Sequence, residues 1–181
     1  MSMVESRSLS EPLAIIVMGV SGCGKTSVGR AIAAAFNLDF LEGDSFHPDA
    51  NIAKMSAGIP LTDEDRWPWL DRIGQEIARH AAEGASLVIS CSSLRRIYRD
   101  RLRSASSGPT LFIFLDGSMA LLKERMSRRE GHFMPVSLLE SQFATLENPV
   151  GEDGVLRIDI SVSKAEVNAR AIGAIRARLD P

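Results

Sequence analysis

A glycine-rich segment at residues 19–26, Gly-Val-Ser-Gly-Cys-Gly-Lys-Thr, most constrains how this chain can fold. It matches the phosphate-binding pattern of a glycine, four residues and Gly-Lys-Ser/Thr. The unbroken apolar run before it, residues 14–18, is typical of a strand buried on both faces. The apolar residues that follow it at helical spacing are Val28, Ile32, Ala35 and Phe36. The segment therefore predicts a strand, a phosphate-binding loop and a helix.

Each residue type in this loop suits the binding of a phosphate. Glycines let the backbone curl until several N–H groups point at one anion, and the following helix adds the positive end of its dipole. Lys25 supplies a mobile charge for the β- and γ-phosphates, and the Thr26 hydroxyl can ligate Mg²⁺. The predicted ATP-binding residues are Gly19, Val20, Ser21, Gly22, Cys23, Gly24, Lys25 and Thr26. A glycine-rich turn that binds nothing is the alternative, and the complete motif with both flanks disfavours it.

Composition narrows the class of protein. The chain has 181 residues, 45% of them hydrophobic and 24% charged, which favours one globular kinase domain over residues 12–181 behind a flexible tail at residues 1–11. The formal net charge of −2 predicts no attraction to nucleic acid or to an anionic membrane. Neither a secretory signal nor a run of ~18 apolar residues is visible, so we expect a cytoplasmic protein. Cys23 and Cys91 show no disulfide or metal-site spacing and are expected to be buried.

Strands and helices alternate along the chain. The expected strands are residues 14–18, 39–41, 87–91, 111–116 and 155–160. The expected helices include residues 48–57, 120–131 and 136–146 and a last helix from 163. A further helix ends near Glu83, but its start is ambiguous, because Thr62 offers a cap whereas Pro68 disfavours helical angles at Trp67. This alternation predicts an α/β fold in which helices cover both faces of a five-stranded parallel sheet, with the strand order left open.

The carboxylates at the end of the second strand are the first candidates for chemistry. No Asn-Lys-x-Asp pattern of a guanine site is present, and Ser90-Cys91-Ser92 stands where many ATPases carry an aspartate. Ligands of open α/β sheets bind beyond the carboxyl ends of the strands, which is where Glu42 and Asp44 lie. Asp44 can accept a proton from a substrate hydroxyl or orient that hydroxyl, and Glu42 can hold a water bound to Mg²⁺. A turn residue and a solvated carboxylate are the respective alternatives.

Several motifs together resemble the gluconokinase family over roughly residues 13–178. Beside the phosphate loop, the N-terminal set is Glu42-Gly43-Asp44, Phe46-His47-Pro48, Asn51, Lys54-Met55, Gly58, Pro60-Leu61, Asp65-Arg66 and Pro68-Trp69-Leu70. The C-terminal set is Cys91-Ser92, Leu94, Tyr98-Arg99-Asp100, Leu102-Arg103, Arg129, Gly131-His132-Phe133, Ser141-Gln142-Phe143 and Leu146-Glu147. The combination is specific, whereas the loop alone is shared with shikimate and nucleoside monophosphate kinases.

The resemblance implies a reaction and a fold. The reaction is transfer of the ATP γ-phosphate, with Mg²⁺, to the 6-hydroxyl of D-gluconate. The fold is that of P-loop NTPases of the nucleoside-monophosphate-kinase type, a three-layer α/β/α sandwich with a small helical lid. Its fourth and fifth strands lie on one side of the first strand, and its second and third lie on the other. A homodimer is one assembly state that the resemblance suggests.

The anionic substrate requires a cationic partner. Arg66 is the candidate for the gluconate carboxylate, with His47 and Lys54 as helpers. A surface ion pair with Asp63 or Asp65 is the alternative for Arg66, and satisfying the turn before Pro48 is the alternative for His47. The resemblance adds Ser92 and His132 to the expected substrate-binding residues.

A group of arginines is expected to form the lid at about residues 125–140. Arg125, Arg128 and Arg129 can close over the phosphates and stabilise the charge of the transition state, and Gly131 can act as the hinge. An exposed basic helix end is the alternative. The predicted catalytic residues are thus Lys25, Asp44, Arg125 and Arg129. Two rival functions remain: a different small-metabolite kinase of the shikimate kinase type, and a non-catalytic ATP-binding regulator.

Overall fold

A parallel sheet of five strands lies at the centre of the computed structural model, which describes residues 11–128 and 135–180. The strands are β1 (Ala14–Met18), β2 (Asp39–Glu42), β3 (Leu87–Ser90), β4 (Thr110–Asp116) and β5 (Val155–Asp159). Their order in the sheet is β2-β3-β1-β4-β5, and every pairing is parallel. The predicted α/β fold and the strand arrangement implied by the resemblance are therefore confirmed.

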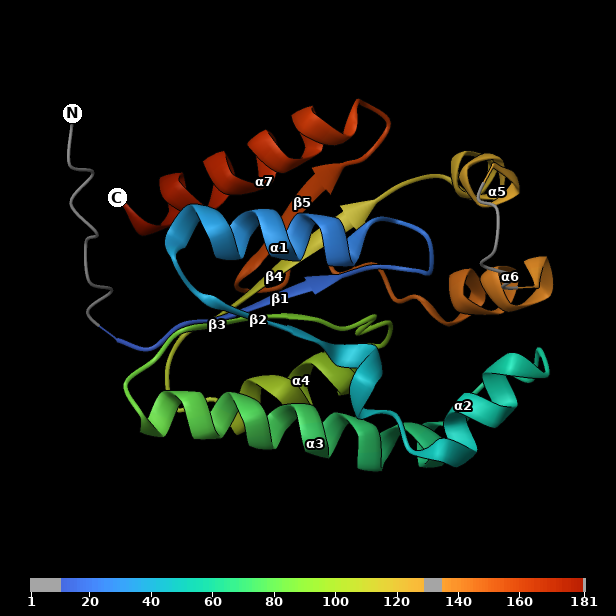
Figure 1. The fold of residues 1–181 in the computed structure, drawn as a ribbon, viewed down its shortest axis with the longest axis horizontal. Coiled ribbons are helices and arrows are strands. Elements are labelled where there is room, and N and C mark those ends of the chain that lie inside the picture. The colour runs from blue at the N-terminus through green and yellow to red at the C-terminus, as the bar shows by residue number, and fades with distance from the viewer. Residues whose placement is uncertain (1–10, 129–134, 181) are drawn as a thin grey trace.

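Helices cover both faces of this sheet (Figure 1). Helices α1 (Lys25–Phe36) and α7 (Lys164–Leu179) pack on one face, and α3 (Asp63–Ala82) and α4 (Arg96–Ala105) pack on the other. All residues of β1 and β3 are buried, as their unbroken apolar sequences require. Val28 and Ile32 of the predicted apolar face of α1 are buried, as expected. Ala35, which was predicted to share this face, is exposed.

The remaining helices lie at the carboxyl edge of the sheet, where the strands end. They are the short 3₁₀ helix η1 (Gly43–Phe46), α2 (Asp49–Ser56), α5 (Met119–Ser127) and α6 (Val136–Thr145). Figure 1 shows α6 above α2 at this edge, and the loop between β1 and α1 reaches the same edge. The chain thus brings the phosphate loop and the end of β2 to the same edge.

Helix α3 begins at Asp63 and continues through Pro68, so the expected disturbance at Trp67 is wrong. The Thr62 hydroxyl accepts a hydrogen bond from the Asp65 N–H at 3.2 Å, and the Asp65 carboxylate accepts one from the Thr62 N–H at 2.9 Å. This capping box fixes the first turn before the proline is reached. Arg66, Trp69 and Leu70 are buried on both sides of Pro68, and their burial offsets the cost of the missing N–H.

Two other boundaries differ from the sequence-based expectation. Helix α5 ends at Ser127, before the predicted end at Gly131, which lies outside the described residues together with Arg129 and His132. Strand β5 ends at Asp159, although the Ile160 N–H still donates to the Asp116 carbonyl at 3.1 Å.

The predicted tail also lies outside the described residues except for Glu11, and the predicted lid lies partly outside them.

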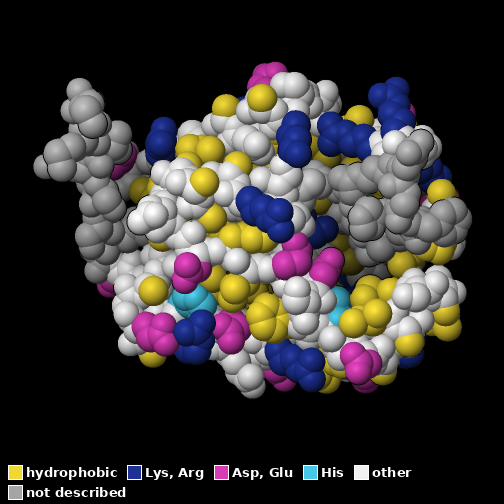
Figure 2. All heavy atoms as spheres, in the orientation of Figure 1, with side chains coloured by type: hydrophobic (Ala, Val, Ile, Leu, Met, Phe, Trp, Pro, Cys, Tyr) yellow, Lys and Arg dark blue, Asp and Glu magenta, His cyan; other side chains and the backbone are white. Residues whose placement is uncertain are grey.

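Charged side chains of both signs are interspersed on the face of the molecule in Figure 2. Many are members of surface ion pairs, such as Arg79 with Glu76 and Glu83 on α3. Within residues 11–128 and 135–180, no helix combines the length and the apolar character needed to cross a membrane.

Candidate active site

The loop between β1 and α1 has the curled backbone that its glycines predict. Gly19, Gly22 and Gly24 have φ angles of 144°, 79° and 98°, values that side chains disfavour. A Cβ on Gly19 would lie 2.9 Å from the Leu115 carbonyl oxygen and 2.7 Å from Cys23 Sγ. The loop is therefore folded tightly against the ends of the central strands.

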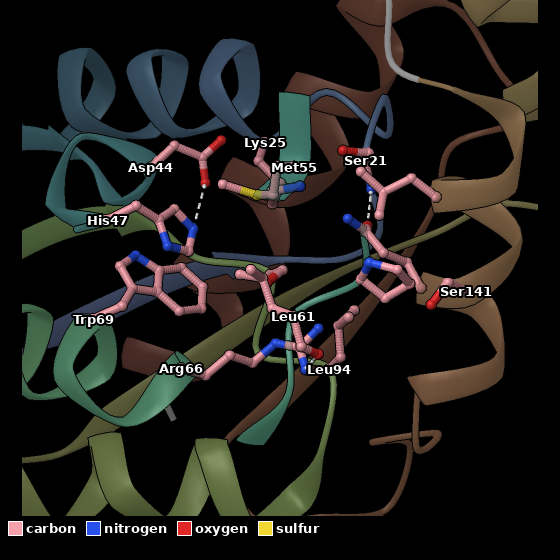
Figure 3. A pocket seen from close by; sticks show the side chains of 14 residues that line it. Ser21, Lys25, Asp44, His47, Met55, Leu61, Arg66, Trp69, Leu94 and Ser141 are labelled. Atoms are coloured by element: carbon pink, nitrogen blue, oxygen red, sulfur yellow. Dashed lines mark hydrogen bonds and ion pairs between the residues drawn. The ribbon is translucent and has the colours of Figure 1, made fainter. Parts of the chain in front are cut away.

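Polar groups of this loop face an oxygen acceptor from a distant helix. The Ser21 N–H donates a hydrogen bond to Gln142 Oε1 of α6 at 2.7 Å, and Figure 3 shows this contact at the edge of a pocket. The Lys25 ammonium donates to the carbonyl oxygens of Gly19 and Val20, each at 3.1 Å. The Ser21 N–H thus donates to a side-chain oxygen next to the Lys25 ammonium. A backbone donor and a positive charge placed together in this way are suited to bind the phosphate groups of a nucleotide.

Thr26 and Glu42 form a pair of hard oxygen donors below the loop. Thr26 Oγ1 donates to Glu42 Oε2 at 2.5 Å, and the Ser90 hydroxyl donates to the other oxygen of the same carboxylate. Ser90 Oγ also accepts from the Gly43 N–H at 3.0 Å, which ties the ends of β2 and β3 together. A hydroxyl and a carboxylate next to a phosphate-binding loop suit Mg²⁺, which prefers few protein oxygens together with phosphate and water.

A pocket opens between the loop, η1, α3 and α6 (Figure 3). The pocket is open to solvent on one side, and charged, polar and apolar side chains line it. Ser21 and Lys25 line it from the loop, and Ser141 and Gln142 line it from α6. Asp44 and Arg66 line it as well, so the phosphate loop and predicted substrate-binding residues share one cavity.

Gly43 and Trp69 set the position of η1 at this pocket. A Cβ on Gly43 would lie 1.7 Å from the Ser90 carbonyl oxygen, so only glycine allows η1 to pass this close to β3. The Trp69 indole N–H donates to the Gly43 carbonyl at 2.8 Å. Asp44 follows directly in the sequence. It lines the pocket, and its side chain is 71% exposed to solvent.

His47 is buried beside Asp44. Its ring stacks on Trp69 with centroids 4.1 Å apart, and its Nε2 lies 3.9 Å from Asp44 Oδ1. Burial lowers the pKa of His47 to about 4, with the Arg66 charge adding to the effect and the Asp44 charge opposing it. The imidazole is therefore neutral at neutral pH.

Arg66 is a buried cation that faces the pocket and has no ionic partner in the part of the chain that the structure describes. Its side chain belongs to a residue only 8% exposed, and its Nη1 donates to the Leu61 carbonyl at 2.7 Å and to the Tyr98 hydroxyl at 3.2 Å. No carboxylate among residues 11–128 and 135–180 forms an ion pair with it. A buried guanidinium with neutral partners is suited to hold an anion from outside.

The two aspartates that sequence analysis offered as partners of Arg66 are engaged elsewhere. Lys54 pairs with Asp65 at 2.8 Å, and this bond, with help from Thr62, lowers the pKa of Asp65 to about 2. Asp63 accepts hydrogen bonds from the Tyr98 hydroxyl and from Arg95, which lower its pKa. The alternative of a surface ion pair for Arg66 is therefore wrong.

The structure brings some of the other predicted residues to the pocket and not others. Ser92 lines it, and the Ser92 carbonyl accepts from the Gly19 N–H at 3.3 Å. Lys54 lies outside the lining, held by Asp65. Arg125 donates to the Ile160 carbonyl at 2.5 Å. Arg129 and His132 lie outside the described residues, so their roles stay predictions.

Both cysteines are buried free thiols, as expected. Burial raises the pKa of Cys23, and it raises that of Cys91 to about 11. Both therefore stay protonated at neutral pH, and Cys23 contributes to the phosphate loop through its backbone.

Sequence reasoning assigned no role to Gln142, which lines the pocket, or to Asn51, which contacts the pocket residue His47. Gln142 reaches the loop from 121 positions along the chain, a distance that no local pattern can reveal. Asn51 is 3% exposed and contacts His47 four residues before it in the chain. The burial of Asn51 follows from its contacts with His47 and with the Asp65 carbonyl, which the local sequence does not reveal.

Known proteins resemble this chain over most of its length. The family described as "AAA domain" matches residues 15–149. "Thermosensitive gluconokinase" of Escherichia coli (strain K12) is 47% identical over 163 residues, which cover 90% of this chain and 87% of that protein. The chain belongs to the gluconokinase family.

Further gluconokinases agree with this assignment. "Gluconokinase" of Gluconobacter oxydans (strain 621H) is 47% identical, with 82% of this chain and 83% of that protein covered. The crystal structure of a gluconokinase from Sinorhizobium meliloti 1021 superposes with a TM-score of 0.87 at 50% identity and covers 93% of this chain and 94% of that one. A shikimate kinase from Aquifex aeolicus, at a TM-score of 0.57 and 11% identity, shares the fold alone.

Proposed function

We propose that this chain uses ATP to phosphorylate D-gluconate at the 6-hydroxyl, giving 6-phospho-D-gluconate. Relatives named gluconokinase at 47% identity over most of the chain support this activity. The observation that carries it in the structure is Arg66, a buried cation without an ionic partner among the described residues, in the same pocket as the phosphate loop. This geometry fits an anionic substrate next to a phosphate donor.

On the donor side, the loop amides hold the ATP phosphates and Lys25 neutralises their charge. Ser21 already presents its N–H to an oxygen, and the Lys25 ammonium lies within reach of the same loop. Thr26 and Glu42 would hold Mg²⁺, which when bound neutralises phosphate charge in the transition state. The protein thereby aligns the terminal phosphate with the pocket.

On the acceptor side, Arg66 and Asp44 hold the two ends of the sugar acid. The carboxylate and the 6-hydroxyl stand at opposite ends of gluconate, and both Arg66, which is buried, and Asp44, whose side chain is exposed, line the pocket (Figure 3). Asp44 accepts or orients the proton of the hydroxyl, and His47 donates a hydrogen bond beside it. Ser92 adds a polar contact from the end of β3.

The lid completes the proposed site. Arg125, with Arg129 and His132, would close over the phosphates from about residues 125–140 and exclude water. Lys54 would assist gluconate binding indirectly, because its ion pair with Asp65 holds α2 against the first turn of α3, next to Arg66. A homodimer and a cytoplasmic location are further proposals that rest on the family resemblance.

The rival functions differ in the substrate that they require. A kinase of the shikimate type would phosphorylate a cyclic acid, and a regulator would bind ATP without releasing ADP. The resemblance to shikimate kinase is limited to the fold, at 11% identity, so it lends no support to that substrate.

A coupled ADP-release assay tests the proposal. We expect turnover of D-gluconate, with none of shikimate and with much weaker turnover of neutral D-glucitol. Arg66→Met should raise the KM for gluconate about 10- to 100-fold, because a hydrogen bond between charged groups contributes about 1.5–3 kcal/mol. It should change the KM for D-glucitol little, since that polyol has no carboxylate.

Arg79→Met is the matched control, because Arg79 is an exposed arginine on the same helix that pairs with Glu76 and Glu83. Its gluconate KM should equal that of the parent. Absence of gluconate-dependent ADP release would refute the activity. Normal gluconate KM in Arg66→Met would place the carboxylate site elsewhere.

A further inference from the structure

Asn51 joins α2 to α3 and to His47 through one amide group. Its Nδ2 lies 2.8 Å from the backbone carbonyl oxygen of Asp65 and 3.3 Å from Nδ1 of His47. Asn51 is 3% exposed and His47 is 7% exposed, so neither contact is replaced by bulk water. The three groups form a short chain of hydrogen bonds inside the wall of the pocket.

The direction of this chain is set at the Asp65 end. A backbone carbonyl can only accept a hydrogen bond, so the amide nitrogen of Asn51 must face it. The second hydrogen of the same NH₂ group then points at His47 Nδ1, which has to be the unprotonated nitrogen. Turning the amide over would place two acceptors together at Asp65, and a proton on Nδ1 would place two donors together at His47.

From this geometry we infer that Asn51 is a positioning residue, which holds His47 as a neutral imidazole with its proton on Nε2. Nε2 is the nitrogen that faces Asp44 and the pocket, 3.9 Å from the nearer carboxylate oxygen. His47 therefore presents a hydrogen-bond donor to the pocket and has no free lone pair there. The catalytic consequence rests on the proposed function: His47 donates to a substrate oxygen, and Asp44 remains the acceptor of the hydroxyl proton.

The surroundings of His47 favour this neutral form. Trp69 covers one face of the ring, and the charged groups that face it are Asp44, which favours the imidazolium, and Arg66, which opposes it. Burial outweighs the attraction of Asp44 and keeps the pKa of His47 below its usual value. At neutral pH the ring therefore carries one N–H proton, and the contact with Asn51 assigns that proton to Nε2.

Nitrogen-15 NMR of the full chain tests the tautomer without any substrate. Two-bond ¹H–¹⁵N correlations distinguish a protonated ring nitrogen from an unprotonated one, and a His47→Gln spectrum assigns the His47 signals among the three histidines. We expect an unprotonated Nδ1 and a protonated Nε2 at neutral pH. A protonated Nδ1 in the parent protein would overturn the inference, whatever the substrate.

Asn51→Asp provides the second arm, because a carboxylate at this position can only accept a hydrogen bond from Nδ1, where the amide donates one. His47 should then carry a proton on Nδ1. Asp49→Asn is the matched control on the exposed side of the same helix and should leave the His47 spectrum unchanged. The double variant Asn51→Asp with Asp49→Asn keeps the net charge of the parent. An unchanged His47 spectrum in folded Asn51→Asp would overturn the inference. If Asn51→Asp does not fold, the parent spectrum alone decides.

Kinetics separate a donor from a base. His47→Gln keeps an N–H donor and should lower kcat by less than about tenfold, whereas loss of a general base lowers it about 10²- to 10⁴-fold. His47→Leu removes the donor and should raise the gluconate KM more than His47→Gln does. A loss of 10²-fold or more in kcat for His47→Gln would assign proton removal to His47 and contradict the inference. Lack of gluconate turnover in the parent would instead refute the proposed function and leave the NMR result standing.

Discussion

At the scale of single residues, Gly43 decides where the acidic end of β2 lies. A Cβ at this position would lie 1.7 Å from the Ser90 carbonyl oxygen and 2.9 Å from its carbon, and neither backbone atom can move without shifting β3. Gly43→Ala should therefore lower the free energy of unfolding by about 3 kcal/mol or more and displace Glu42 and Asp44. Urea denaturation measures the first effect, and kcat measures the second.

Gly173 offers a matched control for this substitution. It lies inside α7, and a Cβ there would meet no atom within 4 Å. Gly173→Ala should stabilise the protein by roughly 0.5–1 kcal/mol, because alanine loses less backbone entropy in a helix. Equal stability of the two variants would show that the close approach at Gly43 is not real.

Asp44 is the residue on which proton transfer is expected to depend. Asp44→Asn keeps the size of the side chain but removes its ability to take a proton, so kcat should fall about 10²- to 10⁴-fold. ATP affinity, measured by calorimetry, should not change, since the loop and Lys25 hold the phosphates. A kcat near that of the parent would refute the role, and Asp49→Asn is the control for an exposed aspartate nearby.

Arg66 shows what sequence could reveal at this scale and what it could not. The family resemblance indicated an anion site, whereas the residue type alone left an ion pair with Asp63 or Asp65 as the alternative. In the structure, Tyr98 of α4 donates a hydrogen bond to Asp63, and Lys54 of α2 forms an ion pair with Asp65. Which charges remain unpaired depends on contacts between elements, and local spacing carries no information about them.

At the scale of elements, Arg99 of α4 holds the segment that follows β3. It is fully buried and donates to the carbonyl oxygens of Ser93 and Leu94 at 2.8 and 3.0 Å. Its charge is balanced by Glu152, whose Oε1 lies 2.5 Å from Nη2. Ser93 has a φ of 49°, so this anchored turn also carries backbone strain next to Ser92 of the pocket.

The Glu152 carboxylate makes this anchor sensitive to acid. Hydrogen bonds from Arg99, followed by those from Arg103, hold its pKa below the usual value of 4.5. A lowered pKa in the folded state means that the stabilisation is complete above pH 4.5 and is lost as pH falls through the folded pKa. Glu152→Gln should therefore cost about 3 kcal/mol at pH 7, and the difference from the parent should shrink below pH 4.5.

Unfolding by urea at several pH values measures this effect. Glu166→Gln is the control, because Glu166 forms an exposed pair with Arg170 that contributes less than about 1 kcal/mol. A constant difference between Glu152→Gln and the parent from pH 7 to the acid range would contradict the lowered pKa.

Helix α3 shows where sequence patterns conflict at this scale. The cap offered by Thr62 favoured an early start and Pro68 favoured a later one, and no local rule ranks the two. Burial of Trp69 and Leu70 against the sheet decides for a continuous helix. By contrast, the strand at residues 14–18 followed from its unbroken apolar run, because no competing pattern overlaps it.

At the scale of the whole molecule, the contact between α6 and the phosphate loop joins the two sides of the pocket. Ser21 and Gln142 are 121 residues apart, and the sequence motif around Gln142 indicated family membership without a position in space. The parallel sheet brings the loop to one edge, and the long connection after β4 returns α6 to the same edge (Figure 1). The topology thus sets a side-chain oxygen where a phosphate oxygen is expected to bind.

This arrangement predicts competition between Gln142 and the nucleotide. ATP has to displace Gln142 Oε1 from the Ser21 N–H, and a hydrogen bond of this kind contributes about 1 kcal/mol. Gln142→Ala should therefore bind ATP about fivefold more tightly in calorimetry, while adenosine, which has no phosphate for the loop, should bind as it does to the parent. Gln75→Ala, an exposed glutamine on α3, should change neither affinity. Weaker ATP binding by Gln142→Ala would mean that this side chain holds the phosphates itself, so that α6 closes onto the nucleotide instead of yielding to it.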